Sequence, residues 1–586
     1  MSNPSGAKKS RLQKDAIPGA ALAAWVTPLI VALLTAVAFL PEFKNGFVGW
    51  DDYENLLENP HFQGLDWTQL RWMFTTFHLS LYRPLTWMTL GLDYNLWGMN
   101  PFGYHLTSLV FHAVNAVLVY FLCLLLLRRA ISSPSIPGEI PLKIAAGFAA
   151  LVFALHPLRV EAVTWISGRE NVVAGCFGLA ALLCYLKAAA GEKRAWWLSL
   201  AVVIYALSLL GKASGMTLPL VLVVLDIYPL KRLGPGRWLG SDALKVWLEK
   251  LPFAILGLAA AVIGVLAKQE TGAMSSFAQY GLARRLAQAL FGLAFYLWKT
   301  LLPVGLSPLY ELPSQFNPLE WHFVLSAAAV LAITAVLLMA RRRWQAALAA
   351  WACYVILLLP ILGIAQSGPQ IVADRYSYLA CLGWAMLAGA AMLHGWRLWV
   401  NGRIGPRLFI SAAGLGAVIL IGLGFMTWQQ TQIWHDSETL WRHALAVAER
   451  SRFKSSVAHY NLGKIVGSQG NLTEAIEHYR QALQIDPGYA KARNNLGNAL
   501  FARGELAEAI EHYRLALKVD PAHAKAHYNL GAALASRGNL AEATEHFRQA
   551  VRIDPDYVKA HHSLGVALAR EGDLEEAIGH FRQAVR

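Results

Sequence analysis

Long apolar runs, separated by short polar segments, fill the first 428 residues of the chain. Each run approaches the roughly 20 residues that a helix needs to cross a bilayer. This pattern predicts eleven membrane-spanning helices, at about 22–40, 104–127, 144–156, 171–190, 195–211, 215–229, 247–266, 322–340, 344–364, 376–394 and 408–428.

The first run follows a basic segment that contains Lys8, Lys9, Arg11 and Lys14. Such a segment is typical of a signal peptide, but this apolar run is long and further spans follow it. We therefore predict an uncleaved anchor after a cytoplasmic tail of residues 1–21, leading into a transmembrane domain at 22–428.

Basic residues occupy alternate loops. The loops on the side of the N-terminus hold 21 Lys and Arg against 6 Asp and Glu, whereas those on the other side hold 11 against 13. An excess of Lys and Arg marks the cytoplasmic side. The prediction is a multi-pass plasma (bacterial inner) membrane protein with a cytoplasmic N-terminus and a first extracytoplasmic loop at 41–103.

One segment, residues 281–302, is apolar enough to span the membrane but has basic residues at both ends. As a span it would move Arg341, Arg342 and Arg343 to the outer side, so an interfacial or re-entrant helix is favoured. Eleven spans then place everything after residue 428 outside the cytoplasm.

From about Ser455 the pattern changes to a repeat of 34 residues. Leu-Gly recurs at 462–463, 496–497, 530–531 and 564–565, a second Gly recurs at 470, 504, 538 and 572, and Asp-Pro recurs at 486–487, 520–521 and 554–555. This period is typical of the tetratricopeptide (TPR) repeat, a pair of antiparallel helices. We expect four repeats at 455–586, preceded by a linker or half-repeat at 429–454. The array reaches Arg586 without a solvating cap helix, so we expect it to be truncated or capped by another element.

The charge of the chain also divides at residue 428. The net charge of +14 resides almost entirely in the apolar part, because residues 429–586 hold 19 Lys and Arg against 18 Asp and Glu. A basic nucleic-acid-binding face is excluded, and the basicity is interpreted as an orientation signal.

Cysteine and histidine give weaker signals. The five Cys all fall in predicted spans and form no CxxC pair, so neither a disulfide framework nor a zinc site is indicated. Histidine recurs in register at 478, 512, 546 and 580. A metal stripe is one interpretation, and a repeated polar position on the second helix is favoured over it.

Candidate chemistry gathers in the outer loops, where charged residues adjoin apolar spans. The acidic pair Asp51-Asp52 follows the first span. Adjacent carboxylates raise one another's pKa, which suits a general base, and Arg or Lys beside the membrane can hold a lipid phosphate. Alternatively, the acidic pair is a turn and cap, and Arg159 and Arg169 pair with Glu161 or Glu170. The candidate binding residues are Arg83, His156, Arg159, Glu161, Arg169, Glu170, Lys212 and Arg375.

The order of motifs resembles a known family. His156-Pro-Leu-Arg-Val-Glu-Ala-Val163, Ser167-Gly-Arg-Glu-Asn-Val172 and Gly211-Lys-Ala-Ser-Gly-Met-Thr217 precede the repeats. This layout resembles the GT-C glycosyltransferases, and more closely the transmembrane-and-TPR (TMTC-type) protein O-mannosyltransferases. The resemblance implies an all-α polytopic GT-C-like membrane domain followed by a TPR solenoid, a polyprenyl-phosphate sugar as donor, and Asp51-Asp52 as the catalytic pair.

Together these observations predict an inverting membrane-embedded glycosyltransferase. It would move a mannose-like sugar from a polyprenyl phosphate to Ser or Thr hydroxyls of an extracytoplasmic protein bound by the repeats. No cofactor is expected, and a divalent metal at the acidic pair is possible but not favoured. Two alternatives stay open: a GT-C enzyme with a lipid or glycan acceptor, and a non-enzymatic membrane scaffold or transporter that uses its repeats.

Overall fold

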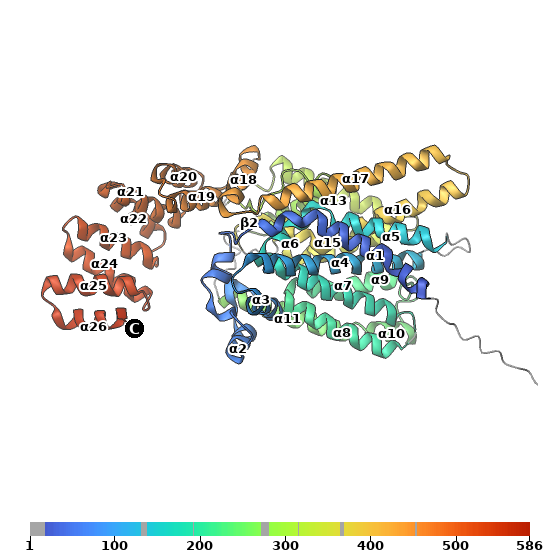
Figure 1. The fold of residues 1–586 in the computed structure, drawn as a ribbon, viewed down its shortest axis with the longest axis horizontal. Helices are drawn as coiled ribbons and strands as arrows, with labels where there is room; N and C mark the ends of the chain where they lie inside the picture. Colours follow the sequence, from blue (N-terminus) through green and yellow to red (C-terminus); the bar gives the residue numbers. More distant parts are fainter. Residues whose placement is uncertain are drawn as a thin grey trace, which may run out of the picture.

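The computed structural model describes residues 18–130, 138–191, 193–270, 281–313, 316–363, 368–451 and 454–585. A bundle of long helices forms a membrane body, and a curved array of helix pairs projects from one end of it (Figure 1). The prediction of an all-α membrane domain followed by TPR repeats is confirmed.

The membrane body contains seventeen α-helices within the described residues. They are α1 (Pro18–Phe39), α2 (Trp67–Thr75), α3 (Pro84–Trp97), α4 (Pro101–Ala130), α5 (Glu139–Ala154), α6 (Val160–Thr164), α7 (Glu170–Ala188), α8 (Arg194–Gly211), α9 (Leu218–Ile227), α10 (Ser241–Leu248), α11 (Leu251–Glu270), α12 (Leu282–Leu301), α13 (Trp321–Met339), α14 (Gln345–Leu358), α15 (Ser377–Ala380), α16 (Leu382–Val400) and α17 (Pro406–Gln432).

Short 3-10 and π-helical turns join these helices. They are η1 (Leu40–Lys44), η2 (Tyr53–Leu57), η3 (Pro60–Phe62), η4 (His78–Ser80), η5 (Pro157–Arg159), η6 (Ile166–Arg169), η7 (Ala213–Thr217), η8 (Leu359–Ile361) and η9 (Asp374–Tyr376). Two short strands, β1 (Tyr310–Glu311) and β2 (Gln370–Val372), pair antiparallel.

Among the described residues, seven helical segments are long and apolar enough to cross a membrane, or nine if each of two bent pairs counts as one span. Two shorter apolar helical segments, Ala213–Ile227 and Gln345–Ile361, accompany them. The two bent pairs, Glu139–Ala154 with Pro157–Thr164 and Asp374–Ala380 with Leu382–Val400, turn by 57° and 51°. Together these segments correspond to the eleven predicted spans, and the bends carry several of the predicted site residues.

The helix α12 is absent from this set of candidate spans. Near its start, Gln288 donates to the carbonyl of Ile371 over 3.4 Å, and near its end the carbonyl of Thr300 lies 3.0 Å from His156 Nε2. Ile371 precedes the bend of one pair, and His156 lies at the bend of the other. The interfacial or re-entrant placement of this segment stays a prediction, and α12 packs on α13.

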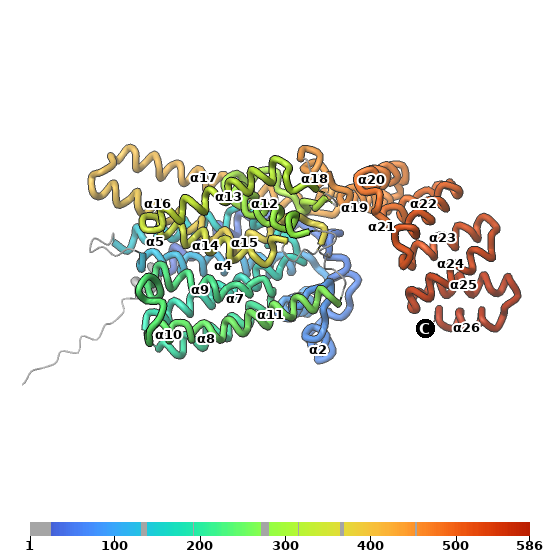
Figure 2. Tube along the Cα trace, turned by 180° about the vertical axis from the view of Figure 1, so that it is seen from behind, coloured from blue at the N-terminus to red at the C-terminus, as the bar shows by residue number. Residues whose placement is uncertain are grey.

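Helices α4, α5 and α7 lie in the core of the membrane body, which explains why their sequences are apolar on all sides (Figure 1). The first outer loop, with α2 and α3, lies at the same end as the repeat array. The view from behind shows α7, α9 and α14 next to one another, and α14 packs on α9 (Figure 2).

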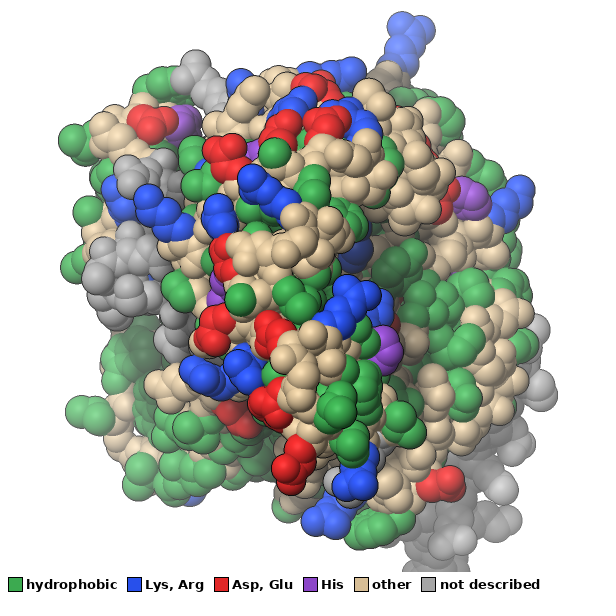
Figure 3. All heavy atoms as spheres, turned by 90° about the vertical axis from the view of Figure 1, so that its left-hand side faces the viewer, with side chains coloured by type: hydrophobic (Ala, Val, Ile, Leu, Met, Phe, Trp, Pro, Cys, Tyr) green, Lys and Arg blue, Asp and Glu red, His purple; other side chains and the backbone are tan. Residues whose placement is uncertain are grey.

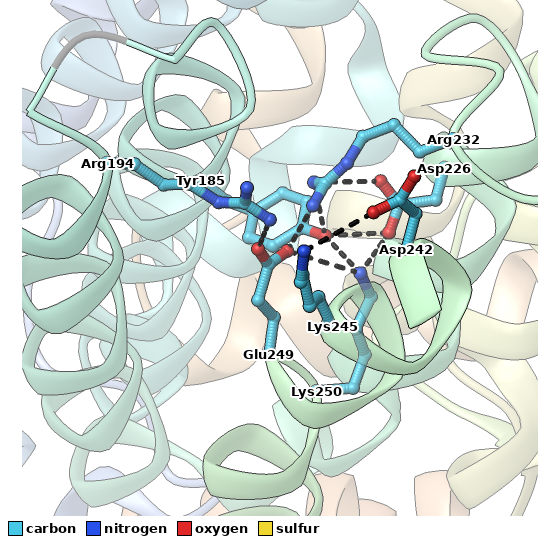
Figure 4. Close-up of polar contacts among 8 residues, drawn as sticks. All are labelled: Tyr185, Arg194, Asp226, Arg232, Asp242, Lys245, Glu249 and Lys250. Atoms are coloured by element: carbon cyan, nitrogen blue, oxygen red, sulfur yellow. Dashed lines mark hydrogen bonds and ion pairs between the residues drawn. The ribbon is translucent and has the colours of Figure 1, made fainter. Parts of the chain in front are cut away.

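A charge cluster with a buried centre lies around α10, at the end of the body away from the repeat array (Figure 1 and Figure 4). Asp226, at the end of α9, is fully buried and forms ion pairs with Arg232 and Lys250, and Tyr185 donates a hydrogen bond to it over 2.7 Å. Glu249 pairs with Arg194 and Arg232. In the sequence, Asp226 is an ionisable residue near the end of a predicted span. In the structure, its carboxylate has these ion pairs and this hydrogen bond.

The repeat array consists of a root helix, α18 (Ser437–Arg450), and four helix pairs. The pairs are α19 (Ser456–Ser468) with α20 (Leu472–Ile485), α21 (Ala490–Ala502) with α22 (Leu506–Val519), α23 (Ala524–Ser536) with α24 (Leu540–Ile553), and α25 (Val558–Glu571) with α26 (Leu574–Val585).

The two glycines that recur in each repeat are required for different structural reasons. Gly504 has φ +88° at the turn within its pair, a conformation that L-residues with a side chain rarely adopt. Gly497 faces the ring of Tyr513, and a Cβ there would lie 2.6 Å from it. Gly504 therefore permits the turn, and Gly497 permits the close approach of the two helices.

Candidate active site

The acidic pair lies where the first outer loop meets the bend between α6 and α7. Asp52 is 1% exposed, and both of its carboxylate oxygens accept hydrogen bonds. Oδ1 accepts from the backbone N of Ser167 over 3.0 Å and from its hydroxyl over 2.6 Å, and Oδ2 accepts from the backbone N of Val48 over 3.1 Å. Asp52 therefore fastens the loop to the bend.

Asp51 differs from its neighbour. It is half-buried, and among the described residues its carboxylate accepts no hydrogen bond. Burial raises its pKa to about 6, and the positive charges of Arg375 and Arg83 oppose that rise. Of the two acids, Asp51 is thus the one with free acceptor oxygens.

The predicted cause of the pKa rise needs correction. Burial is the main cause for both acids, and it raises the pKa of Asp52 to about 6 as well. The charge of Asp52 adds only a smaller rise to the pKa of Asp51. The two carboxyl groups are therefore perturbed by their low-dielectric surroundings more than by each other.

Two carboxylates organise the neighbouring cations. Glu170 is 7% exposed and pairs with Lys212 at 2.8 Å and with Arg83 at 3.2 Å. Glu161 forms an ion pair with the guanidinium of Arg375 and accepts a hydrogen bond from its backbone N over 2.7 Å. The alternative in which Arg159 and Arg169 pair with these acids is not what the structure shows.

Three predicted binding residues have other partners. Arg169 is fully buried and pairs with Asp93, and it donates to the carbonyl of Tyr104 over 2.7 Å. Arg159 is 1% exposed and donates to Ser377, 3.3 Å away. His156 is also buried, with Nδ1 accepting from the N of Leu158 and Nε2 next to the carbonyl of Thr300.

A pocket opens beside the cations. It has an empty volume of about 530 Å³ and includes Lys212, Arg375 and Asn171 among its lining residues. The amide oxygen of Asn171 accepts from Lys212 Nζ over 2.7 Å. Two cations and an amide around one pocket form a site that can hold an anion.

A larger apolar cavity lies next to this pocket. It has an empty volume of about 1090 Å³, and α4, α7, α9, α14 and α16 line it. Leu357, Leu379 and Ala380 line both spaces. The cavity extends along these helices to Ala130, Tyr228 and Ala346, near the end of the body that lies away from the repeat array.

Several residues of this site carry no signal in the sequence. Asn55 accepts from Arg83 over 2.8 Å and donates to the hydroxyl of Ser167 over 3.0 Å. Ser437, at the start of α18, accepts from the backbone N of Gly49 over 2.7 Å. Partners separated by 112 and 388 positions cannot be inferred from spacing.

The repeated histidines contact histidines on the first helix of the same repeat. The Nδ1 atoms lie 3.1 Å apart in His459 and His478, with similar pairs at 527 and 546 and at 561 and 580. His512 departs from this pattern because Arg493 occupies the corresponding position. Among the described residues, no group of three or more His, Cys, Asp or Glu could hold a metal ion.

Comparison with known proteins bears on this arrangement. The family model for the TPR repeat matches residues 463–502, 497–536 and 531–572. Protein O-mannosyl-transferase Tmtc3 of Drosophila melanogaster is 25% identical over 457 residues, which cover 69% of this chain and 48% of the fly protein. Protein O-mannosyl-transferase TMTC1 of Homo sapiens is 25% identical over 466 residues, or 72% of this chain and 49% of that protein. The chain resembles the TMTC-type protein O-mannosyltransferases.

The similarity extends beyond the repeats. Human protein O-mannosyl-transferase TMTC4 is 26% identical over 534 residues, covering 79% of this chain and 67% of that protein. The chain spans about half the length of the first two relatives. Among solved structures, the crystal structure of MamA has 25% sequence identity to this chain. The match covers 28% of this chain and 91% of the MamA chain, with a TM-score of 0.24.

Proposed function

We propose that the chain is a membrane-embedded glycosyltransferase that moves a mannose-like sugar from a polyprenyl phosphate to Ser or Thr hydroxyls of an extracytoplasmic protein. The observation that carries this proposal is a pocket lined by Lys212 and Arg375 beside an apolar cavity, with Asp51 under the electrostatic influence of the same Arg375. The similarity to protein O-mannosyltransferases supports the same reaction.

In this reaction the ionised carboxylate of Asp51 takes the proton of the acceptor hydroxyl. The hydroxyl oxygen attacks the anomeric carbon as the bond from that carbon to the phosphate oxygen breaks. The leaving polyprenyl phosphate keeps the electron pair of that bond. Inversion follows because the nucleophile and the leaving group lie on opposite faces of the sugar.

Lys212 and Arg375 would hold the phosphate. Both line the pocket, and both are also paired with buried carboxylates that fix their positions. Arg can contact a phosphate through two N–H groups, whereas Lys acts as a point charge. Arg83 would act indirectly, through its ion pair with Glu170.

The apolar cavity would hold the first isoprene units of the donor. Its lining is almost entirely apolar, and it shares Leu357, Leu379 and Ala380 with the phosphate pocket. A lipid-linked donor gains binding free energy from buried CH₂ groups, about 0.8 kcal/mol for each. A soluble nucleotide sugar has no use for such a cavity, so the cavity favours a lipid carrier.

We propose that no divalent ion takes part. Both oxygens of Asp52 are engaged by backbone and hydroxyl donors, which leaves only Asp51 of the acidic pair free to bind a metal. EDTA treatment of the purified protein should leave transfer unchanged, and restoration of lost activity by Mg²⁺ or Mn²⁺ would contradict this.

We further propose that the first outer loop and the repeats face away from the cytoplasm, in a plasma membrane. The alternation of basic loops supports this orientation. The repeats would recruit the acceptor protein, as their solenoid form suggests. Protease added to spheroplasts should digest the repeats. Protection of the repeats would show that the orientation is the reverse of the proposed one.

The decisive experiment is transfer by the reconstituted protein. Purified protein is mixed with polyprenyl-phosphate mannose and an acceptor protein, and the acceptor is examined by intact-mass spectrometry. We expect a mass gain of one or more hexoses that Asp51→Asn abolishes. Transfer to a lipid or glycan instead would show that the acceptor is not a protein. Absence of any transfer would favour a non-enzymatic scaffold.

A further inference from the structure

The root of the repeat array touches the loop that carries the acidic pair. The backbone N of Gly49 donates to the hydroxyl of Ser437 over 2.7 Å, and the indole N–H of Trp441 donates to the carbonyl of Gly49 over 3.2 Å. The rings of Trp50 and Trp441 meet edge to face, with centroids 4.9 Å apart. One residue, Gly49, is thus held at both its N–H and its C=O by α18.

The contact is closely fitted. A Cβ on Gly49 would lie 3.2 Å from the hydroxyl oxygen of Ser437, so the Ser437 side chain would have to shift by a few tenths of an ångström. Trp441 is fully buried, and Ser437 is 9% exposed. Just upstream, the N of Gly46 donates to the carbonyl of His435 over 2.9 Å. These contacts form a continuous interface between the acidic loop and the root helix.

The position of Asp51 depends on its backbone. Its carboxylate accepts no hydrogen bond from the described residues, so no side-chain contact of that kind fixes it. The backbone is anchored on one side by Asp52, through Ser167, and on the other by Gly49, through α18. Loss of the second anchor would leave the Asp51 carboxylate free to shift and to hydrate.

The start of the first repeat, at α19, also contacts the membrane body. Glu311 in β1 accepts hydrogen bonds from the hydroxyls of Ser455 and Ser456, over 2.7 and 2.6 Å. The neighbouring Tyr310 donates to Asp374 over 3.0 Å, and Asp374 directly precedes Arg375. The repeat array is therefore joined both to the acidic loop and to the strand that contacts the residue before Arg375, and it is not attached through its connecting segment alone.

We propose that α18 is part of the active site, and that Ser437 and Trp441 are positioning residues that hold Asp51 in place for proton transfer. This inference rests on the proposed function, in which Asp51 is the base. It goes beyond acceptor recruitment, because the root of the array would set the turnover of the enzyme even for an acceptor that needs no repeats.

The test compares Trp441→Phe and Ser437→Ala in the full chain, using a short Ser-containing peptide as acceptor. Trp441→Phe keeps an aromatic ring against Trp50 and removes the indole N–H. We expect kcat to fall about tenfold or more in each variant, because small displacements of a catalytic group are costly. The KM values for donor and peptide should stay within about twofold, since neither residue lines the donor pocket.

A pH profile separates positioning from general damage to the fold. Burial raises the pKa of Asp51 to about 6, so hydration of a loosened loop would lower that pKa toward its ordinary value of 3.8. The acid limb of kcat should therefore move to lower pH in both variants. A smaller fraction of folded protein would lower the amplitude of the profile without moving this limb.

Two further variants complete the design. Ser437→Thr keeps the hydroxyl acceptor and should restore much of the lost turnover. Glu449→Gln changes an exposed residue of the same helix and should behave like the unchanged protein. Unaltered kcat and acid limb in Trp441→Phe and Ser437→Ala, alongside an inactive Asp51→Asn, would overturn the positioning role alone. Full activity of Asp51→Asn would instead overturn the proposed function.

Discussion

Two adjacent aspartates of the same loop have different surroundings. Asp52 satisfies three donors and is closed to solvent, whereas Asp51 keeps its oxygens free and lies within the electrostatic influence of Arg375 and Arg83. The sequence shows only that two carboxylates are adjacent. The difference between their surroundings depends on Ser167, which reaches Asp52 from a bend 115 positions further along the chain.

The pH dependence of transfer follows from the pKa of Asp51. A general base must be ionised, and burial raises this pKa to about 6, so kcat/KM should rise with pH through about 6 and then level off. Steady-state rates between about pH 4.5 and 8 measure this limb. Asp51→Asn should lower the rate by about 10²–10⁴-fold, the usual contribution of a general base. A profile that is flat below about pH 6 would contradict the assignment.

Lys212 and Arg169 offer a second comparison at this scale. Lys212 lines the pocket, so Lys212→Ala should raise the donor KM about tenfold, equivalent to the loss of about 1.4 kcal/mol, and leave the acceptor KM unchanged. Arg169 is buried against Asp93, so Arg169→Ala should instead destabilise the fold by about 3–5 kcal/mol. Donor titrations and detergent unfolding curves measure the two effects. Equal donor KM values in both variants would contradict the division.

At the scale of elements, periodicity predicted helices well and predicted their ends and bends less well. Apolar runs of about 20 residues indicate spans. The 34-residue period indicates helix pairs, in which Gly497 and Gly504 mark the close approach and the turn of one repeat. The bend at His156-Pro157 is different, because its 57° turn brings Glu161 to Arg375 by tertiary packing. Local sequence preferences do not specify such a contact.

The cluster around Asp226 tests how the elements are joined at the end of the body that lies opposite the repeats (Figure 4). Asp226→Asn would leave the buried Lys250 and the partly buried Arg232 without this carboxylate, so we expect a loss of about 3–5 kcal/mol in unfolding free energy. Equilibrium unfolding in mixed micelles measures it.

A matched control lies in the same cluster. The side chain of Asp242 is 96% exposed and pairs with Lys245 one turn along α10. Asp242→Asn should change the unfolding free energy by less than about 0.5 kcal/mol, as expected for an exposed position. Equal unfolding midpoints for the two variants would show that the ion pairs of Asp226 contribute little to stability.

At the scale of the whole molecule, the charge pattern and the architecture agree. The repeats carry both signs, and Lys and Arg are interspersed with Asp and Glu on the face at that end of the molecule (Figure 3). Successive repeats are linked by exposed pairs such as Arg480 with Glu508 and Arg514 with Glu542. The net positive charge lies in the membrane body, and we interpret it as an orientation signal.

The sequence predicted that a helical membrane domain precedes the TPR repeats, but it did not predict how the two meet. Arg169 was expected near the donor phosphate and pairs with Asp93 instead, because the position of a charge in an outer loop does not reveal its partner. The contact between Gly49 and Ser437 joins positions 388 residues apart. Only the assembled fold places the acidic loop against the repeat root.

The apolar cavity provides the last prediction, because it links donor chemistry to the depth of the membrane body. Ala349 in α14 lines the cavity, and Ala349→Trp would fill part of it. We expect the KM for a long-chain polyprenyl donor to rise about tenfold or more, since displaced isoprene units lose their buried contacts. A donor analogue with one or two isoprene units should be affected far less, because its chain ends before the obstruction. Ala412→Trp, on the exposed surface of α17, is the matched control and should leave both donors unaffected. If Ala349→Trp impaired both donors equally, the cavity would not be the site of the lipid chain.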